Sequence, residues 1–209
     1  MAQIKVVLFD FGGVLAEEGF REGLYCIARR HGLDPERFYR AARDVVYESG
    51  FVTGDGTEER FWRDMRLRFP LQGTDQALSE EILQRFVLRP GMVRLVAQLH
   101  TAGLLTGLLS DQTVWLDRLD RRDHFYRLFD RLYISCRLGM GKRAPALFRE
   151  VLKDLSVPGP QVLFIDDDGG NVARACQAGM VAFRFQDEAS CRQRLAEMLG
   201  EDVFSAGAA

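Results

Sequence analysis

The chain has 209 residues, of which 28 are basic and 30 acidic, so its formal net charge at pH 7 is −2. This near balance predicts neither nucleic-acid binding nor adsorption to an anionic membrane, and it makes small diffusible molecules the expected partners. The first residues suit neither a secretory leader nor a membrane span, and the cysteines lack metal-ligand spacing. We therefore expect a cytoplasmic protein with reduced, packed thiols at Cys26, Cys136, Cys176 and Cys191.

A strand is predicted first, over residues 4–9 (IKVVLF), where a short apolar run shows no clean alternation. That pattern is typical of a strand covered on both faces in a parallel sheet. The run ends at Asp10, and Gly12 and Gly13 follow. An aspartate before two glycines is most simply a turn, so Asp10 gains functional meaning only from what lies at the ends of the other strands.

Residues 16–87 contain one helical pattern after another and no strand pattern. Helix starts are predicted at Asp34 with Pro35, at Thr57 before two glutamates, and at Ser79 before two more. The aromatic residues of this stretch are expected to form a small core of their own, made of Phe38, Phe61, Trp62 and Phe69. We therefore predict a helical cap over residues 16–87, inserted into a core made of residues 1–15 and 88–209.

Strand and helix patterns alternate after residue 88. A helical apolar pattern over residues 92–99 begins after Pro90 and stops at Gly103. Further strands are predicted over residues 104–109, 132–135, 162–165 and 181–185, and a further helix over residues 148–155. This alternation implies right-handed βαβ units, and hence an α/β fold with a doubly wound, Rossmann-like parallel sheet.

Polar residues follow several of these strands, at the edge where open α/β sheets bind ligands. Taken singly they have plain interpretations: a helix cap at Ser110 and Asp111, a solvated charge near a helix start at Lys142, and an acidic loop before a helix at Asn171. Their joint occurrence at strand ends predicts one site. Its residues are Asp10, Ser110, Lys142 in the stretch LGMGK, which is expected to open a helix, and the run Asp166, Asp167 and Asp168.

Four segments, FDFGGVL, LLSD, GMGK and FIDDDGGNV, occur in this order. They resemble the four motifs of the haloacid dehalogenase (HAD) superfamily, with the helical C1 cap of its subfamily I inserted after the first motif. LRPGM, RLYISCRLGMGK and FIDDDGGNV look most like the capped phosphatase branch, which includes small sugar-phosphate phosphatases. The resemblance spans nearly the whole chain. It implies a magnesium-dependent phosphatase that hydrolyses a small phosphorylated metabolite, such as a sugar phosphate, through an aspartyl-phosphate intermediate.

The resemblance also implies a role for each matched residue. Asp10 is the implied nucleophile, and Ser110 and Lys142 are the implied catalytic residues that hold the phosphoryl oxygens. Mg²⁺ is the implied cofactor, because it offsets the repulsion between a carboxylate and a phosphate. Its implied ligands are Asp10, the backbone carbonyl of Gly12, and Asp167, with Asp166 bound directly or supporting them. The implied substrate-binding residues are Gly12, Gly13, Ser110, Asp111, Lys142 and Asn171.

Two positions depart from the family pattern. Most of these phosphatases carry an aspartate two residues after the nucleophile, where it transfers protons, and this chain has Gly12. Three explanations stay open: a cap residue or Asp111 takes over, the substrate has a good leaving group such as an anomeric or acyl phosphate, or the enzyme is weak or silent. Asp111 stands where asparagine is usual, and Arg143 is expected to supply the cation that offsets its charge.

Two other functions remain as alternatives. A dehalogenase acting on small 2-halo acids also uses an aspartate nucleophile without an aspartate two residues later, but it needs no metal and usually lacks the acidic run at 166–168. A regulatory module would keep the fold and bind phosphate without turnover. For the phosphatase, the cap is expected to move and exclude water, with Tyr47, Phe51 and residues 50–56 at its edge. The substrate and the oligomeric state are left open.

Overall fold

The computed structural model describes residues 3–205, and within them five parallel strands form one sheet in the order β3-β2-β1-β4-β5. Every predicted strand is present, with ends that differ from the prediction by no more than two residues. The α/β fold with a doubly wound parallel sheet is thereby confirmed. The strands are β1 (Val6–Phe9), β2 (Leu105–Ser110), β3 (Arg131–Ile134), β4 (Val162–Asp166) and β5 (Val181–Arg184).

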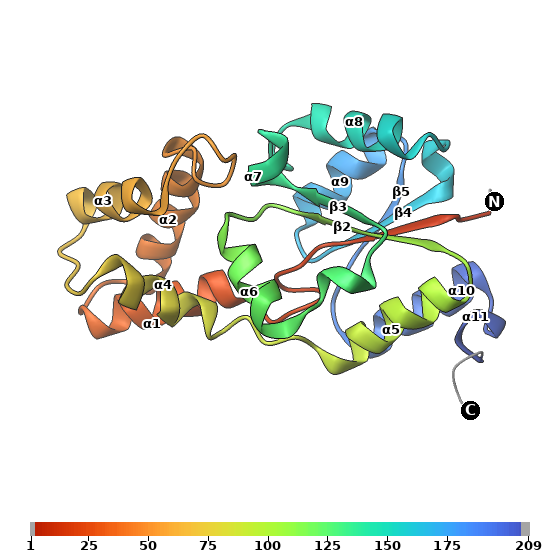
Figure 1. Ribbon diagram of the computed structural model, residues 1–209, viewed down its shortest axis with the longest axis horizontal. Coiled ribbons are helices and arrows are strands. Elements are labelled where there is room, and N and C mark those ends of the chain that lie inside the picture. Colours follow the sequence, from red (N-terminus) through yellow and green to blue (C-terminus); the bar gives the residue numbers. More distant parts are fainter. Residues whose placement is uncertain (1–2, 206–209) are drawn as a thin grey trace.

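Helices cover both faces of the sheet (Figure 1). Val6 and Leu8 of β1 pack in a cluster with α8 (Pro145–Leu155) and α9 (Gly169–Gln177). Val7 and Phe9 point to the other face, where α5 (Pro90–Thr101) and α10 (Glu188–Leu199) contribute buried side chains and α11 (Asp202–Ser205) lies against α5. Because β1 is buried on both faces, its sequence shows a continuous apolar run instead of an alternation.

Most helix ends follow the predicted signals. Pro90 begins α5, and Gly103 lies just beyond its end with a positive φ of 84°. Asp34 and Thr57 cap α2 (Pro35–Glu48) and α3 (Glu58–Arg68). The start predicted at Ser79 is wrong, because the Thr74 hydroxyl accepts from the Ala77 N–H at 3.2 Å and α4 (Asp75–Leu83) begins earlier.

The helical insertion, which we define as α1 (Gly19–Arg30) through α4, forms a lobe at one end of the molecule (Figure 1). The chain enters and leaves it side by side. The Glu17 N–H donates to the Val87 carbonyl at 2.9 Å, and the Arg89 N–H donates to the Leu15 carbonyl at 2.9 Å. Two adjacent crossings therefore join the insertion to the sheet.

A buried aromatic cluster packs the insertion against the core. Trp115, at the start of α6 (Trp115–Asp123), has its ring 5.2 Å from that of Phe51, 6.0 Å from Phe61 and 6.4 Å from Trp62. All four side chains are buried, in one apolar cluster that continues to the sheet. The expectation that the aromatics of the insertion form a core of their own is wrong, because α6 fills the space between the insertion and the sheet.

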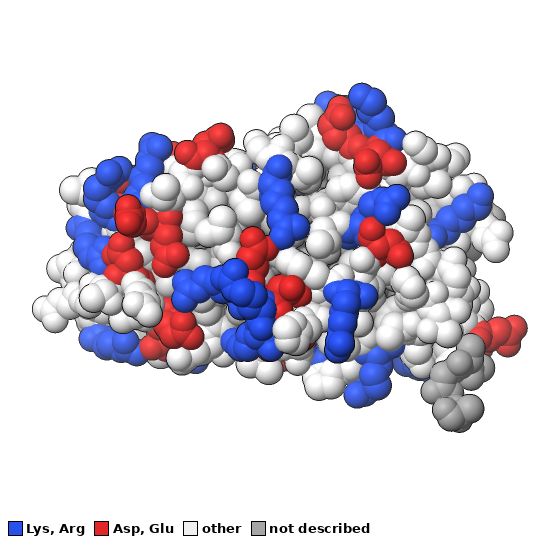
Figure 2. Space-filling model, in the orientation of Figure 1, with Lys and Arg blue, Asp and Glu red and all other residues white. Residues whose placement is uncertain are grey.

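The rest of the chain completes the connections. They are η1 (Tyr126–Leu128), α7 (Ser135–Leu138), directly after β3, and η2 (Gly159–Gln161) before β4. All four cysteines are free thiols, but Cys176 is exposed, contrary to the expected packing. Acidic and basic side chains are interspersed on the face shown in Figure 2. Within residues 3–205, no helix is both long and apolar enough to cross a membrane.

Trp115 offers a direct test of the joint between insertion and core. Trp115→Ala should lower the free energy of unfolding by about 3–5 kcal/mol, because it opens a cavity between the two parts. Trp115→Phe is the matched control. It keeps a ring and removes a buried indole N–H that has no hydrogen-bond partner in the described part of the chain, so it should cost much less. Urea unfolding measures both, and equal losses would contradict the packing role.

Candidate active site

The functional residues predicted from the sequence meet at the carboxyl ends of the strands. Asp10 follows β1, Ser110 ends β2 and Asp166 ends β4. From β1 the chain continues to β2 on one side, while β4 pairs with β1 on the other side. Strand order thus reverses between β1 and β4, which is where open sheets form a ligand-binding crevice.

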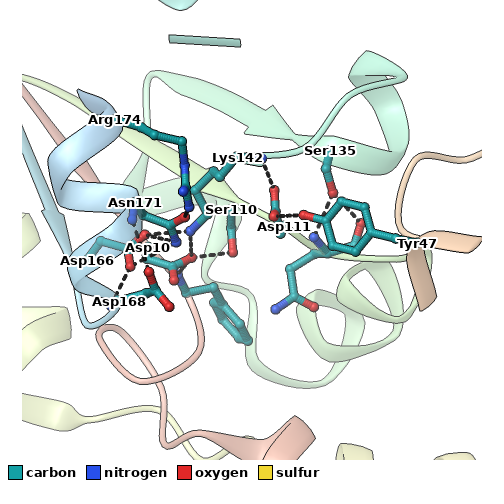
Figure 3. A network of polar contacts seen from close by, with 12 residues as sticks. Asp10, Tyr47, Ser110, Asp111, Ser135, Lys142, Asp166, Asp168, Asn171 and Arg174 are labelled. Carbon is teal, nitrogen blue, oxygen red and sulfur yellow. Dashed lines mark hydrogen bonds and ion pairs between the residues drawn. The ribbon is translucent and has the colours of Figure 1, made fainter. Parts of the chain in front are cut away.

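Asp10 is buried and held by three donors on one oxygen. Its Oδ1 accepts from the Phe11 N–H at 2.7 Å and from the Ser110 hydroxyl at 2.6 Å, and it lies 2.9 Å from the Lys142 ammonium (Figure 3). No residue in the range 3–205 donates to Oδ2. One carboxylate oxygen of Asp10 is therefore oriented by the protein and the other is available to a ligand.

Lys142 is a buried cation between two carboxylates. Its side chain is 2% exposed, and its Nζ lies 2.6 Å from Asp166 Oδ2 as well as 2.9 Å from Asp10 Oδ1 (Figure 3). The expectation that Lys142 opens a helix is wrong. It lies in a turn three residues before Pro145 begins α8, and this turn brings the ammonium under the strand ends.

Asp166 is fully buried, and the surrounding residues occupy both of its oxygens. Oδ1 accepts from the Asp168 N–H at 2.7 Å, and the Asn171 amide donates to both oxygens at 3.0–3.1 Å. Arg174 holds Asn171 in turn, donating to its Oδ1 at 2.6 Å. Asp168 caps α9 by accepting from two backbone N–H groups. In the acidic run, Asp166 is thus buried and fully hydrogen-bonded and Asp168 caps a helix. Asp167 lies between them in the sequence.

Asp167 contributes a third carboxylate to the cluster of Asp10 and Asp166. One carboxylate oxygen from each of the three lies within 4.8 Å of the others. The Asp167 carboxylate packs onto Gly13, where a Cβ would come within 2.5 Å of Oδ2 and where φ is +83°. Only glycine meets both conditions, so the glycine turn after β1 makes room for this carboxylate.

Burial and charge shift the protonation of the cluster. Burial raises the pKa of Asp10 to about 8, and Asp166 and Asp167 add to this rise while Lys142 and the Ser110 hydroxyl oppose it. Burial and the Asp166 charge also raise the pKa of Asp167. Burial alone would lower the pKa of Lys142, but Asp10 and Asp166 outweigh it and raise that pKa. The cluster thus carries more negative charge than Lys142 neutralises.

A cavity of about 810 Å³ opens above the cluster, between the strand ends and α2 of the insertion. Asp10, Ser110 and Asp167 line its core side, and Tyr39 and Tyr47 line the opposite side. Its size is that of a site for a small molecule. Five arginines also line it and favour an anionic ligand, namely Arg21, Arg43, Arg143, Arg174 and Arg184.

A model of haloacid dehalogenase-like hydrolases matches residues 4–179, which is most of the chain. The chain belongs to this family. Bifunctional epoxide hydrolase 2 of Rattus norvegicus is 32% identical over 132 residues, which are 60% of this chain and 23% of that protein, so the chain matches less than a quarter of this relative's length. D-ribitol-5-phosphate phosphatase of Bacteroides thetaiotaomicron is 36% identical over 70 residues, 34% of each protein.

Solved structures of the family share the fold. A HAD family enzyme of Bacteroides thetaiotaomicron, solved as a magnesium complex, has a TM-score of 0.74 at 21% identity and covers 92% of this chain and 100% of that one. The L-2-haloacid dehalogenase of Xanthobacter autotrophicus has a TM-score of 0.64 at 20% identity and covers 97% of this chain and 86% of that one. At these identities the likeness concerns the architecture alone.

The motif residues of this HAD-like hydrolase do not all face the cavity. Asp10, Gly12, Ser110, Lys142 and Asn171 line it, as do Asp111 and Asp167. Gly13 is buried behind the turn against Asp167, and Asp166 lies fully buried beneath the cluster. These two residues therefore support the site from below.

Asp111 has different partners from those expected. Its Oδ1 accepts from the Lys142 backbone N–H at 2.7 Å, and its other oxygen accepts from the Tyr47 hydroxyl across the joint to α2 (Figure 3). The expected pairing with Arg143 is wrong. The Arg143 guanidinium lies 4.0 Å from the centre of the Tyr47 ring and 3.8 Å from Asp44, because both neighbours lie on the facing helix α2.

Sequence reasoning placed some cavity residues and missed others. Tyr47 lines the cavity, but Phe51 is buried in the aromatic cluster and not at the cavity edge, since it packs on Trp115. Glu18 lines the cavity and was not singled out. Its only sequence signal is that it precedes a helix start, and glutamate is not a preferred capping residue, so nothing distinguished it from its neighbour Glu17.

Lys142→Met should destabilise the protein by about 3–5 kcal/mol, because two buried carboxylates lose their counter-charge. The pKa of Asp10 in the fold is about 8, above that of an unfolded aspartate. The folded state therefore holds a proton that the unfolded chain releases, and stability falls as the pH rises between about 3.9 and the folded value. Because Lys142 lowers the pKa of Asp10, replacing Lys142 raises that pKa further. The pH range over which stability falls then extends to higher pH.

The deficit of Lys142→Met should consequently be larger at about pH 8 than at about pH 6. Urea unfolding in the presence of EDTA measures it. Lys153→Met, whose side chain is 81% exposed, is the matched control. A deficit that is independent of pH would mean that Lys142 does not offset the carboxylate charges.

Proposed function

We propose that this HAD-like hydrolase is a phosphatase that hydrolyses a small phosphate ester through an aspartyl phosphate on Asp10. The observation that carries the proposal is the meeting of Asp10, Lys142 and Asp167 at the strand ends, in a cavity lined by arginines. A surplus of buried carboxylates beside a cavity rich in cations suits a dianionic substrate that arrives with a metal ion. It has no evident use in a neutral binding pocket.

Asp10 is suited to act as the nucleophile. The Phe11 N–H, Ser110 and Lys142 fix its Oδ1, so the carboxylate cannot rotate freely, and Oδ2 has no donor among residues 3–205. In the proposed first step an oxygen of Asp10 bonds to phosphorus as the bond from phosphorus to the leaving oxygen breaks. Lys142 and the Ser110 hydroxyl then hold the phosphoryl oxygens, because both donors already converge on this point.

The three carboxylates fit a divalent cation. Their oxygens lie within 4.8 Å of one another, they are the hard ligands that Mg²⁺ prefers, and the glycine turn leaves room for Asp167. Asp10 and Asp167 would hold the ion from the cavity side, and Asp166, whose oxygens are taken by Lys142 and Asn171, would support them. When bound, Mg²⁺ offsets the charge of the phosphoryl group against that of Asp10.

Residues 16–87, which contain the helical insertion, are proposed to act as the cap, and the two crossings pair at the ends of this range. Its α2 forms the wall of the cavity opposite Asp10, so it would exclude water while the aspartyl phosphate forms. The hydrogen bond from Tyr47 to Asp111 ties this wall to the loop after β2. A cavity of about 810 Å³ beneath a helical lobe suits a small metabolite better than a polymer. A phosphorylated sugar or sugar alcohol is the first class to test, since one relative is named as a D-ribitol-5-phosphate phosphatase.

The same fold also occurs in a haloacid dehalogenase, so that activity is the second candidate. In dehalogenation the nucleophile attacks carbon, which needs no metal ion. The additional carboxylate of Asp167 would then have no evident role. Halide release without Mg²⁺, from a protein that releases no phosphate, would favour it. Binding of a phosphate analogue without turnover of any phosphate ester would favour a regulatory module.

Asp10→Asn should abolish phosphate release while the protein stays folded, because the amide is isosteric and a poor nucleophile. Phosphate release from a panel of sugar, polyol and acyl phosphates, with and without Mg²⁺, measures the effect, and circular dichroism checks the fold. Asp44→Asn, at an exposed position on α2, is the control. Full activity of Asp10→Asn would remove Asp10 from the chemistry.

Mg²⁺ should stabilise the folded protein without any substrate. Binding at about one hundred times its Kd adds about 2.7 kcal/mol to the free energy of unfolding. Asp167→Asn should lose most of this gain, whereas Asp168→Asn should keep it, since asparagine caps α9 as well as aspartate does. Thermal unfolding with and without MgCl₂ compares the two neighbours. An equal gain in both variants would place the ion elsewhere.

A further inference from the structure

Gly12 leaves a space beside the nucleophile that carries no proton-transferring group. Its φ lies outside the left-handed region, so its backbone conformation does not require glycine. A Cβ placed there would lie 3.1 Å from Phe86 Cε1, 3.7 Å from Glu18 Oε1 and 3.9 Å from Gln112 Nε2. The carboxyl of Glu18 is therefore the acidic group next to the space that a side chain at position 12 would enter.

Glu18 is held in this position by the helix that it caps. Its Oε2 accepts from the Arg21 N–H at 2.6 Å at the start of α1, which leaves Oε1 directed toward the Gly12 turn. The side chain is partly buried and lines the same cavity as Asp10. One oxygen thus fixes the carboxyl, and the other is open to a ligand.

The surroundings of Glu18 suit a group that changes its protonation state near neutral pH. Burial raises its pKa to about 7, and Asp167 adds to the rise while the Arg21 N–H and the Arg21 charge oppose it. A carboxyl with this pKa can both give and take a proton at physiological pH, as a general acid that later acts as a base must do.

The other acidic and phenolic groups of the cavity are less suited to this role. Asp111 uses both oxygens, for the Lys142 N–H and the Tyr47 hydroxyl. Asp168 caps α9 through Oδ1, but it is exposed, and the three atoms nearest to a Cβ at position 12 belong to Phe86, Glu18 and Gln112. Burial raises the pKa of Tyr39 to about 12 and that of Tyr47 still further, so both phenols are weaker proton donors than the Glu18 carboxyl.

We infer that Glu18 is the general acid and base of this enzyme and supplies, from the N-cap of the first helix of the insertion, the proton transfer that Gly12 lacks. The inference rests on the proposed phosphatase function. In the first step an oxygen of Asp10 bonds to phosphorus as the leaving oxygen separates from it. The Oε1 proton of Glu18 goes to that leaving oxygen. In the second step Glu18 takes a proton from water as the water oxygen bonds to phosphorus and the Asp10–phosphorus linkage breaks.

The experiment compares leaving groups in the full chain with Mg²⁺. Glu18→Gln keeps an oxygen that can accept from the Arg21 N–H, but it cannot donate an acidic proton. In single-turnover assays it should slow release of an alkyl alcohol, from ribitol phosphate or glycerol phosphate, by about a hundredfold or more. It should slow release of dinitrophenolate, which leaves without a proton, by less than about tenfold.

A rescue variant separates chemistry from structure. Gly12→Asp in the Glu18→Gln background should restore most of the alcohol release, provided that Phe86 shifts by a few tenths of an ångström. Glu17→Gln, an exposed neighbour paired with Arg89, should leave both leaving groups unaffected. A structural role for Glu18 predicts the opposite pattern, in which both esters slow equally and Gly12→Asp rescues neither.

The outcomes distinguish this inference from the function on which it rests. If the wild-type chain hydrolyses the esters but Glu18→Gln slows them equally or not at all, Glu18 is not the acid and the phosphatase function stands. If the wild-type chain releases no phosphate from any ester, both fail. A large loss confined to the poor leaving group, reversed by Gly12→Asp, supports the assignment.

Discussion

The site depends on a buried cluster that contains three carboxylates and one ammonium group. Asp10, Asp166 and Asp167 meet within 4.8 Å at the end of the sheet, and Lys142 is the ammonium that lies between two of them. Parallel strands force this meeting, because β1 and β4 are neighbours and both end at the same edge. Burying like charges is costly unless a cation offsets them, so Lys142 is a condition of the fold as much as a part of the site. The remaining negative charge is what makes a divalent ion a suitable partner.

The insertion completes the cavity, and two kinds of contact hold it there. Trp115 lies among the aromatic side chains of the insertion, in an apolar cluster that continues to the sheet. Polar contacts such as Tyr47 with Asp111, and the Ser135 hydroxyl with the Val52 carbonyl at 2.7 Å, lie nearer the cavity. An opening movement of the lobe must therefore expose aromatic surface as well as break hydrogen bonds. Because Asp111 also accepts from the Lys142 backbone N–H, a change at this joint reaches the cluster of Asp10, Lys142 and Asp166.

The two departures from the family pattern have physical consequences that the structure makes concrete. Asp111 contributes a part-buried hydrogen-bonding bridge between α2 and the Lys142 turn, which explains how an additional carboxylate is accommodated at the edge of the cavity. Gly12 removes a carboxyl from the β1 turn, and Glu18 lies beside the vacated space. Under the proposed assignment, the group that transfers protons lies at the N-cap of α1, next to the crossing at Glu17 that joins the insertion to the core.

The sequence by itself determined the alternation of strands and helices, the place of the insertion and the residues at the strand ends. Apolar periodicity and glycine or proline signals act over a few neighbours, so they are readable without the fold. Only the tertiary structure decided the individual contacts between distant segments: the hydrogen bond within the predicted pair of Asp10 and Ser110, which are 100 residues apart, and the one between Tyr47 and Asp111, which are 64 apart. The same holds for Trp115 in the aromatic cluster and for Glu18 beside Gly12. These contacts follow from the packing of α6 and the insertion against the sheet, which no local pattern encodes, and that packing chose Glu18 over its neighbour Glu17.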